Sequence, residues 1–151
     1  MTDFPQVAAF SGDENTIRVV GHRGARGILP ENSIVGFDFA LSIGVDLLEF
    51  DVLLSRDDIP VITHNHEFHG SAVRGADGAF LNGEHPRVAS LTMAEIERFD
   101  IGRLNADTEY GRRFPDQAQI GRHQGTPFGR IAASGVATEI CNRLPDAGIE
   151  V

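Results

Sequence analysis

The chain has 151 residues, of which 41% are hydrophobic and 23% are charged, as is typical of a folded globular domain. Its 22 acidic residues outnumber its 13 Lys and Arg residues and give a net charge of −9. That charge repels nucleic acids and anionic membranes, so neither is an expected partner, whereas a site for a cation is compatible with it.

Residues 1–16 are predicted to be an N-terminal extension. They are acidic and interrupted by Pro5, so they do not resemble a secretory signal. No apolar stretch approaches the length needed to span a membrane, and the single Cys141 excludes an internal disulfide or a multi-cysteine zinc site. We therefore expect a reducing, cytoplasmic setting without stable insertion into a membrane.

A strand, a helix and a second strand are predicted next. The β-branched run 17–20 predicts a buried strand that ends at Gly21. Residues 30–46 predict a helix, with Asn32 or Ser33 as its cap and Gly44 as its end. The stretch DLLEFDVLLS, residues 46–55, predicts the second strand. This order indicates an α/β fold built from a right-handed parallel unit.

The second half of the predicted fold is less regular. Residues 56–59 predict a turn, and residues 60–64 a third short strand that ends at His64. The Gly-rich segment 65–86 is expected to be a long surface loop, a kind of segment that is often functional. A helix is predicted over Leu91–Phe99, with Ser90 or Thr92 as its cap, and segment 102–120 is expected to be irregular.

Two carboxylates on the second strand are the first candidate site residues. Because side chains alternate along a strand, Glu49 and Asp51 share one face, opposite an apolar face. We expect the pair to be buried, and buried carboxylates at this spacing can converge on a hard divalent cation such as Ca²⁺ or Mg²⁺. The alternative is a solvent-facing pair of acids on a half-exposed strand.

Basic residues close the first and third predicted strands. Since ligands of parallel α/β folds gather at the carboxyl ends of the strands, His22, Arg23 and His64 are expected to lie together there. Two histidines can serve as general acid and general base near neutral pH, and an arginine can clamp a phosphate. Glu31, before the predicted helix, lies beside this site or only favours the helix dipole.

Two further patterns carry less information. Loop residues His66, His69 and His85 could in principle bind a transition metal, although incidental solvated histidines account for them as well. The glycines at 21, 24 and 27 do not have the spacing of a dinucleotide-binding fingerprint.

Four motifs in order resemble one known family. The stretches VGHRG, PENS, GVDLLEFDV and PVITHN closely resemble the glycerophosphodiester phosphodiesterases over residues 17–65. The match continues more loosely through RGADGAFL and LTMAEIERFDIGR, which resemble an insertion found in some members. Ser33 stands where the family has Thr, a conservative change at a capping position.

The resemblance implies a TIM barrel of the phospholipase-C-like phosphodiesterase type, of which residues 17–120 would form the first strands and the insertion. At 151 residues the barrel would be incomplete, because a full barrel takes roughly 250 residues. The resemblance also implies roles for individual residues: a divalent cation held by Glu49 and Asp51, acid–base work by His22 and His64, a phosphate contact from Arg23, and near-site positions for Glu31 and Asn32.

The implied activity is that of a phosphoric diester hydrolase of lipid and glycerol metabolism. A small-molecule glycerophosphodiester would be cleaved to glycerol 3-phosphate and an alcohol. In the implied mechanism a neighbouring glycerol hydroxyl attacks phosphorus with the help of one histidine, and the other histidine protonates the leaving alkoxide. The metal and Arg23 stabilise the developing charge.

The chain departs from the family pattern after Ile120. The family's third metal carboxylate, in a later E-x-K strand motif, has no match, and residues 121–151 have an anomalous pattern. A shifted reading frame after Ile120 would explain this tail, and the nucleotide sequence tests that hypothesis. The alternative to an active enzyme is a fragment that has the site's ancestry but no activity of its own.

Overall fold

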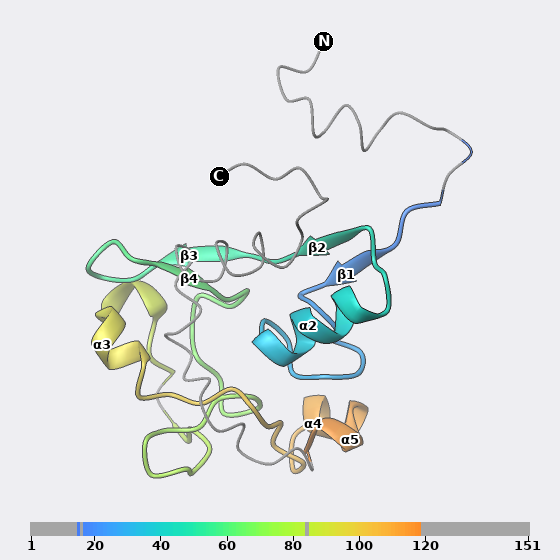
Figure 1. The fold of residues 1–151 in the computed structure, drawn as a ribbon. Helices are drawn as coiled ribbons and strands as arrows, with labels where there is room; N and C mark the ends of the chain where they lie inside the picture. Colours follow the sequence, from blue (N-terminus) through green and yellow to red (C-terminus); the bar gives the residue numbers. More distant parts are fainter. Residues whose placement is uncertain (1–14, 16, 84, 119–151) are drawn as a thin grey trace.

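The computed structural model describes residues 15, 17–83 and 85–118 (Figure 1). The predicted tail 121–151, with Cys141, and nearly all of the predicted N-terminal extension lie outside the described residues. The elements, in chain order, are β1 (Val20–His22), α2 (Ile34–Ser42), β2 (Leu47–Glu49), β3 (Val52–Leu54), β4 (Pro60–Ile62), the 3-10 helix η1 (Val88–Ser90), α3 (Met93–Ile96), α4 (Glu109–Arg113) and α5 (Pro115–Ala118).

The predicted parallel unit is confirmed. β1 pairs in parallel with β2, and α2 connects them. The α2 helix starts at the Ser33 cap, whose Oγ accepts a hydrogen bond from the Gly36 backbone at 3.2 Å. The strand β1 begins three residues later than predicted, because only Val20–His22 pairs with β2. His22 therefore lies in the strand and faces Glu49 in its register.

The second predicted strand is interrupted, and the third runs in the opposite direction. β2 and β3 are separated at residues 50–51, and β3 pairs with β4 in an antiparallel hairpin. The cause is the tight turn over 56–59, in which Asp58 adopts a φ of 60° and the Ser55 backbone binds the Ile59 carbonyl. The third strand therefore does not continue the parallel pair. His64 reaches the site because the hairpin returns the chain to Asp51.

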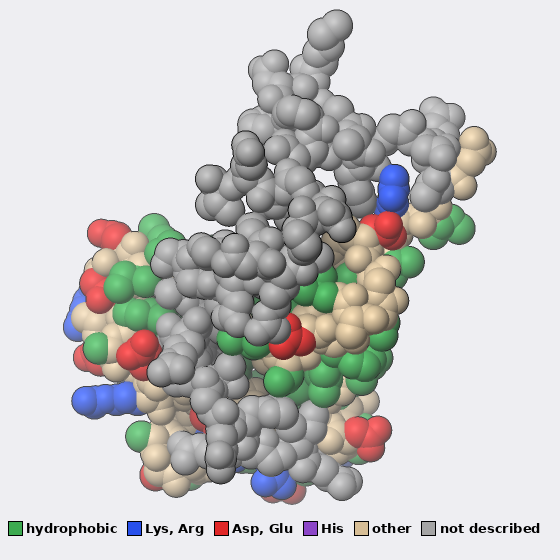
Figure 2. Space-filling model, viewed as in Figure 1, with side chains coloured by type: hydrophobic (Ala, Val, Ile, Leu, Met, Phe, Trp, Pro, Cys, Tyr) green, Lys and Arg blue, Asp and Glu red, His purple; other side chains and the backbone are tan. Residues whose placement is uncertain are grey.

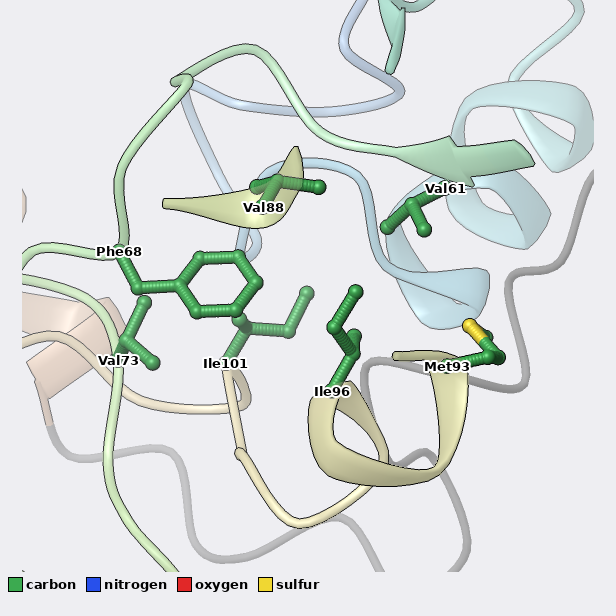
Figure 3. Packing of buried hydrophobic residues seen from close by; sticks show 7 residues of the cluster. All are labelled: Val61, Phe68, Val73, Val88, Met93, Ile96 and Ile101. Carbon is green, nitrogen blue, oxygen red and sulfur yellow. The ribbon is translucent and has the colours of Figure 1, made fainter. Parts of the chain in front are cut away.

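Two hydrophobic clusters form the core. In the smaller, Phe37 of α2 and Ile62 of β4 are buried, and Phe37 makes an edge-on ring contact with Phe50. The larger cluster lies between the hairpin and α3 (Figure 3), and its buried members are Val61, Phe68, Val73, Val88, Met93, Ile96 and Ile101. The segment 65–86 was expected to lie on the surface; that expectation was wrong, since Phe68 and Val73 are core residues.

The segment after residue 102 is more regular than predicted. It contains α4 and α5, although the sequence led us to expect irregular structure throughout. Thr108 caps α4 by accepting a hydrogen bond from the Gly111 backbone at 3.1 Å. The predicted helix over Leu91–Phe99 is present as the shorter α3, which has a reciprocal capping box between Thr92 and Glu95.

Several large hydrophobic side chains of the strands are exposed. Figure 2 shows hydrophobic side chains over the part of the molecule that contains β1 and α2. The most exposed large hydrophobic residues of the strands and their flanks are Ile17, Val19, Val20, Leu47, Val52 and Leu54. Among the described residues, no helix is long and apolar enough to cross a membrane.

Candidate active site

His22 and Glu49 meet because β1 and β2 are parallel and in register. The His22 Nε2 atom lies 3.8 Å from Glu49 Oε2, and the same oxygen accepts a hydrogen bond from the Arg23 backbone at 3.1 Å. The side chains of Glu49 and Asp51 are 42% and 39% exposed, so the expected burial of the pair was wrong.

Arg23 is the buried basic group of the site. Its Nη1 atom donates to both carboxylate oxygens of Glu31, at 3.1 and 3.2 Å. Its Nε atom is buried and has no hydrogen-bond partner, and it lies 3.9 Å from Asp51 Oδ2, a buried oxygen that also has none. Buried polar atoms without hydrogen-bond partners are rare because they lose their hydration, so Nε and Oδ2 each have an unfilled capacity for a hydrogen bond or a ligand.

The backbone around Arg23 is held in an unusual conformation. Arg23 and Asn32 have φ values of 51° and 54°, in the left-handed region that favours glycine. The Asn32 backbone donates to the Arg23 carbonyl at 3.0 Å, so the two residues are held by each other. The Asn32 Oδ1 atom is also buried without a hydrogen-bond partner. Strain of this kind accumulates at functional sites.

A cavity of about 260 Å³ brings several of the predicted residues together. Its lining includes Arg23, Glu31, Asn32 and His64, while His22 is not part of the lining. His64 is exposed, and its Nδ1 atom lies 2.9 Å from Asn65 Oδ1. A ring whose Nδ1–H donates to this oxygen keeps Nε2 available for proton transfer.

The sequence did not indicate two residues that complete the cluster. The Tyr110 hydroxyl donates to Glu31 Oε2 at 2.7 Å and accepts from Arg26 Nε at 3.1 Å. Arg26 Nε also lies 2.8 Å from the same carboxylate oxygen. Burial, followed by the bond to Glu31, raises the pKa of Tyr110, and the bond to Tyr110 raises the pKa of Arg26.

Arg26 follows the conspicuous HRG motif and could have been suspected as a second basic residue. No spacing in the sequence pointed to Tyr110, which is 84 positions away from Arg26.

The donor atoms near Arg23 suit a hard cation better than a transition metal. In residues 15–118, apart from positions 16 and 84, no group of three or more His, Cys, Asp or Glu residues could hold a metal ion. The oxygen atoms of Asp51 and Asn32 that lack hydrogen-bond partners, with the nearby Glu49 carboxylate, are donors that Ca²⁺ and Mg²⁺ prefer. The rings of His69 and His85 are in contact, 4.6 Å between centroids, without a third ligand.

Comparisons with known proteins identify the family of the chain. The model of the glycerophosphoryl diester phosphodiesterase family matches residues 22–138. A glycerophosphodiester phosphodiesterase from Caldanaerobacter subterraneus is 32% identical over 102 residues, which cover 68% of this chain and 38% of that protein. The chain thus spans well under half the length of such relatives. The family match extends to residue 138, into the segment whose sequence pattern is anomalous.

Solved structures give the same result. A crystal structure from Silicibacter pomeroyi, assigned as a glycerophosphoryl diester phosphodiesterase, is 40% identical with a TM-score of 0.79, covering 95% of this chain and 46% of that one. An Oleispira antarctica phosphodiesterase in complex with its product sn-glycerol-3-phosphate is 22% identical with a TM-score of 0.51, covering 87% and 48%. The expected fold, the first part of a TIM barrel, is confirmed.

Proposed function

The chain belongs to the glycerophosphoryl diester phosphodiesterase family, and we propose on this premise that it hydrolyses glycerophosphodiesters to glycerol 3-phosphate and an alcohol. In the net reaction the phosphorus–oxygen bond to the alcohol breaks, and water supplies the oxygen that remains on phosphorus and the proton that remains on the alcohol. The chain is then a phosphoric diester hydrolase that acts on a small molecule. The phosphodiester is an anion, which requires a cationic contact within the site.

The observation that carries the proposal is the buried guanidinium of Arg23. The residue is 9% exposed, its Nη1 is paired with Glu31, and its Nε lacks a hydrogen-bond partner beside a cavity. A phosphate oxygen would give this N–H an acceptor, and the pairing with Glu31 holds the planar group in one orientation. This geometry supports Arg23 as the phosphate contact.

The proposed cofactor is a divalent cation, Ca²⁺ or Mg²⁺. Glu49 and Asp51 would hold it, and the buried oxygens of Asp51 and Asn32 that have no hydrogen-bond partner support an oxygen-ligated site. When bound, such an ion supplies positive charge that stabilises the negative charge developing on the phosphate oxygens. Glu31, which is already paired with Arg23 and Arg26, orients the guanidinium rather than completing the ligand set.

The proposed acid–base pair is His22 and His64. One of them accepts the proton of the attacking glycerol hydroxyl, and the other donates a proton to the leaving alkoxide; water then opens the resulting cyclic phosphate to give glycerol 3-phosphate. The Nε2 atom of His22 lies 3.8 Å from Glu49 Oε2, and His64 lines the cavity, so both rings stand at the edge of the proposed site. Both rings are exposed enough to exchange protons with solvent or substrate.

The test is release of glycerol 3-phosphate from glycerophosphocholine by the purified chain with Mg²⁺ or Ca²⁺. His22→Ala and His64→Ala should each lower turnover about 10²- to 10⁴-fold, the range that general acid–base groups contribute. The control is His66→Ala, which removes an exposed ring two positions from His64 and should leave turnover unchanged. Equal turnover in all three variants would contradict the proposed pair.

The cellular location and the class of substrate are the remaining parts of the proposal. The cytoplasmic location expected from the sequence stays a prediction. The net charge of −9 supports a small-molecule substrate over a nucleic acid, because an acidic chain repels a polyanion. The bound sn-glycerol-3-phosphate of the Oleispira antarctica enzyme supports the same substrate class for this fold.

A further inference from the structure

The carboxylate of Glu31 is held by three separate side chains. Arg23 donates to both of its oxygens, Arg26 lies 2.8 Å from Oε2, and Tyr110 donates to Oε2 at 2.7 Å. The first two come from the loop that precedes α2, whereas Tyr110 comes from α4, far along the chain. The Glu31 side chain is only 18% exposed, so these bonds are largely shielded from water.

The helices α4 and α5 contact this loop at a second point. The side chain of Gln117, a residue only 2% exposed, donates to the backbone carbonyl of Arg26 at 2.8 Å. Figure 1 shows α4 and α5 beneath the loop and the start of α2. The loop is thus fixed through its backbone at Arg26 and through the side chains of Arg26 and Glu31.

We propose that Tyr110 is a positioning residue, which holds Glu31 and through it keeps the Arg23 guanidinium aligned with the cavity. This role rests on the proposed function, because it gives Arg23 the task of binding phosphate. Tyr110 does line the same cavity, but its hydroxyl is occupied by Glu31 and Arg26. It therefore acts on the substrate through Glu31 and Arg23.

The charges around Glu31 explain why a third donor matters. Two guanidinium groups compete for one carboxylate, and Arg26 shares its Nε between Glu31 and the Tyr110 hydroxyl. Without the hydroxyl, Glu31 Oε2 loses a donor and the Arg26 Nε–H is left to the carboxylate alone, so the carboxylate can turn toward Arg26 and away from Arg23. The Nε atom of Arg23, which has no hydrogen-bond partner, would then no longer be held 3.9 Å from Asp51 Oδ2.

The composition provides a specific probe, because Tyr110 is the only tyrosine and there is no tryptophan. Absorbance of the phenolate at high pH therefore reports on this residue alone. In the unmodified chain its pKa should lie above the ordinary value of 10.0, since burial and the Glu31 charge disfavour the phenolate. In Glu31→Gln the pKa should fall, because the carboxylate charge is gone. Identical titrations of the two proteins would overturn the proposal.

The second measurement is calorimetric titration with inorganic phosphate. Tyr110→Phe should weaken binding by roughly 10-fold, about the effect of one hydrogen bond to a charged group. Ser90→Ala is the matched control, because it removes one hydroxyl hydrogen bond from an exposed residue on η1 and should leave phosphate affinity unchanged. Equal affinity in Tyr110→Phe and the unmodified chain would overturn the positioning role alone. Absence of binding to the unmodified chain would overturn the phosphate site of the proposed function, and the positioning role with it.

Discussion

At Arg23 a left-handed backbone, burial and an incomplete set of hydrogen bonds coincide. Its φ is 51°, its exposure is 9%, and its Nε has no hydrogen-bond partner. Each of these features costs free energy in a folded chain, and together they are typical of a residue retained for binding rather than for stability. The bond between the Arg23 carbonyl and the Asn32 backbone keeps this conformation in place.

Replacing Arg23 with lysine should distinguish the effect of the positive charge from that of the hydrogen-bond geometry of the guanidinium. Lysine keeps the positive charge but cannot bind both oxygens of Glu31 while presenting a second N–H toward the cavity. We expect Arg23→Lys to lower turnover of glycerophosphocholine about 10²- to 10³-fold, as the loss of a charge-stabilising donor does. Steady-state release of glycerol 3-phosphate measures it, with thermal unfolding as the check on folding. Turnover within about threefold of the unmodified chain would show that charge alone is sufficient.

The sequence predicted the site residues that lie close together along the chain. Arg23, Glu31 and Asn32 stand within one short motif, and the structure places all three around one cavity together with His64. Tyr110 could not be predicted, because its contact with Glu31 depends on how α4 packs, 79 positions along the chain. Long-range packing of this kind leaves no periodic signal.

At the scale of elements, the differences from prediction have local causes. The alternating pattern of residues 46–55 fits one long strand, but pairing with two different partners divides it into β2 and β3. Strand propensity describes how well each residue suits a strand. It cannot show where one strand ends its pairing and the next begins to pair with a different partner. The helix α4 was missed because it spans only Glu109–Arg113, too short for a helical period to be recognised.

The position of α4 depends on a close backbone approach at Gly111. A methyl group there would lie 1.9 Å from the Asn105 carbonyl oxygen, which already accepts bonds from the Thr108 backbone and hydroxyl. We expect Gly111→Ala to lower the free energy of unfolding by about 1–3 kcal/mol, the usual cost of overpacking. Since α4 supplies Tyr110, phosphate affinity should fall as well.

Gly27→Ala is the matched control for this substitution. A methyl group at position 27 meets nothing within 4 Å, so this change should leave the free energy of unfolding within about 1 kcal/mol of that of the unmodified chain. Denaturant unfolding of both variants measures the difference. Equal stability of Gly111→Ala and Gly27→Ala would show that α4 does not pack on Asn105 as described.

At the scale of the molecule, the chain corresponds to less than half of a solved member of its family. The chain covers 46% of the Silicibacter pomeroyi structure and 95% of its own length in that comparison. The family resemblance identified the architecture from four short motifs, all of which lie between residues 17 and 65. Val20 of β1 and Leu47 of β2 are exposed, and the alternating pattern of a strand does not show which of its faces is covered.

The central claim is that this chain carries a metal-dependent phosphodiesterase site, and Asp51 tests it most directly. The measurement is release of glycerol 3-phosphate from glycerophosphocholine by the folded chain, first stripped with EDTA and then given Mg²⁺ or Ca²⁺. We expect no release before the metal is added, release afterwards, and a reduction of about 10²-fold or more in Asp51→Asn. Release that is equal with and without metal, or no release by the folded chain with either metal, would contradict the account.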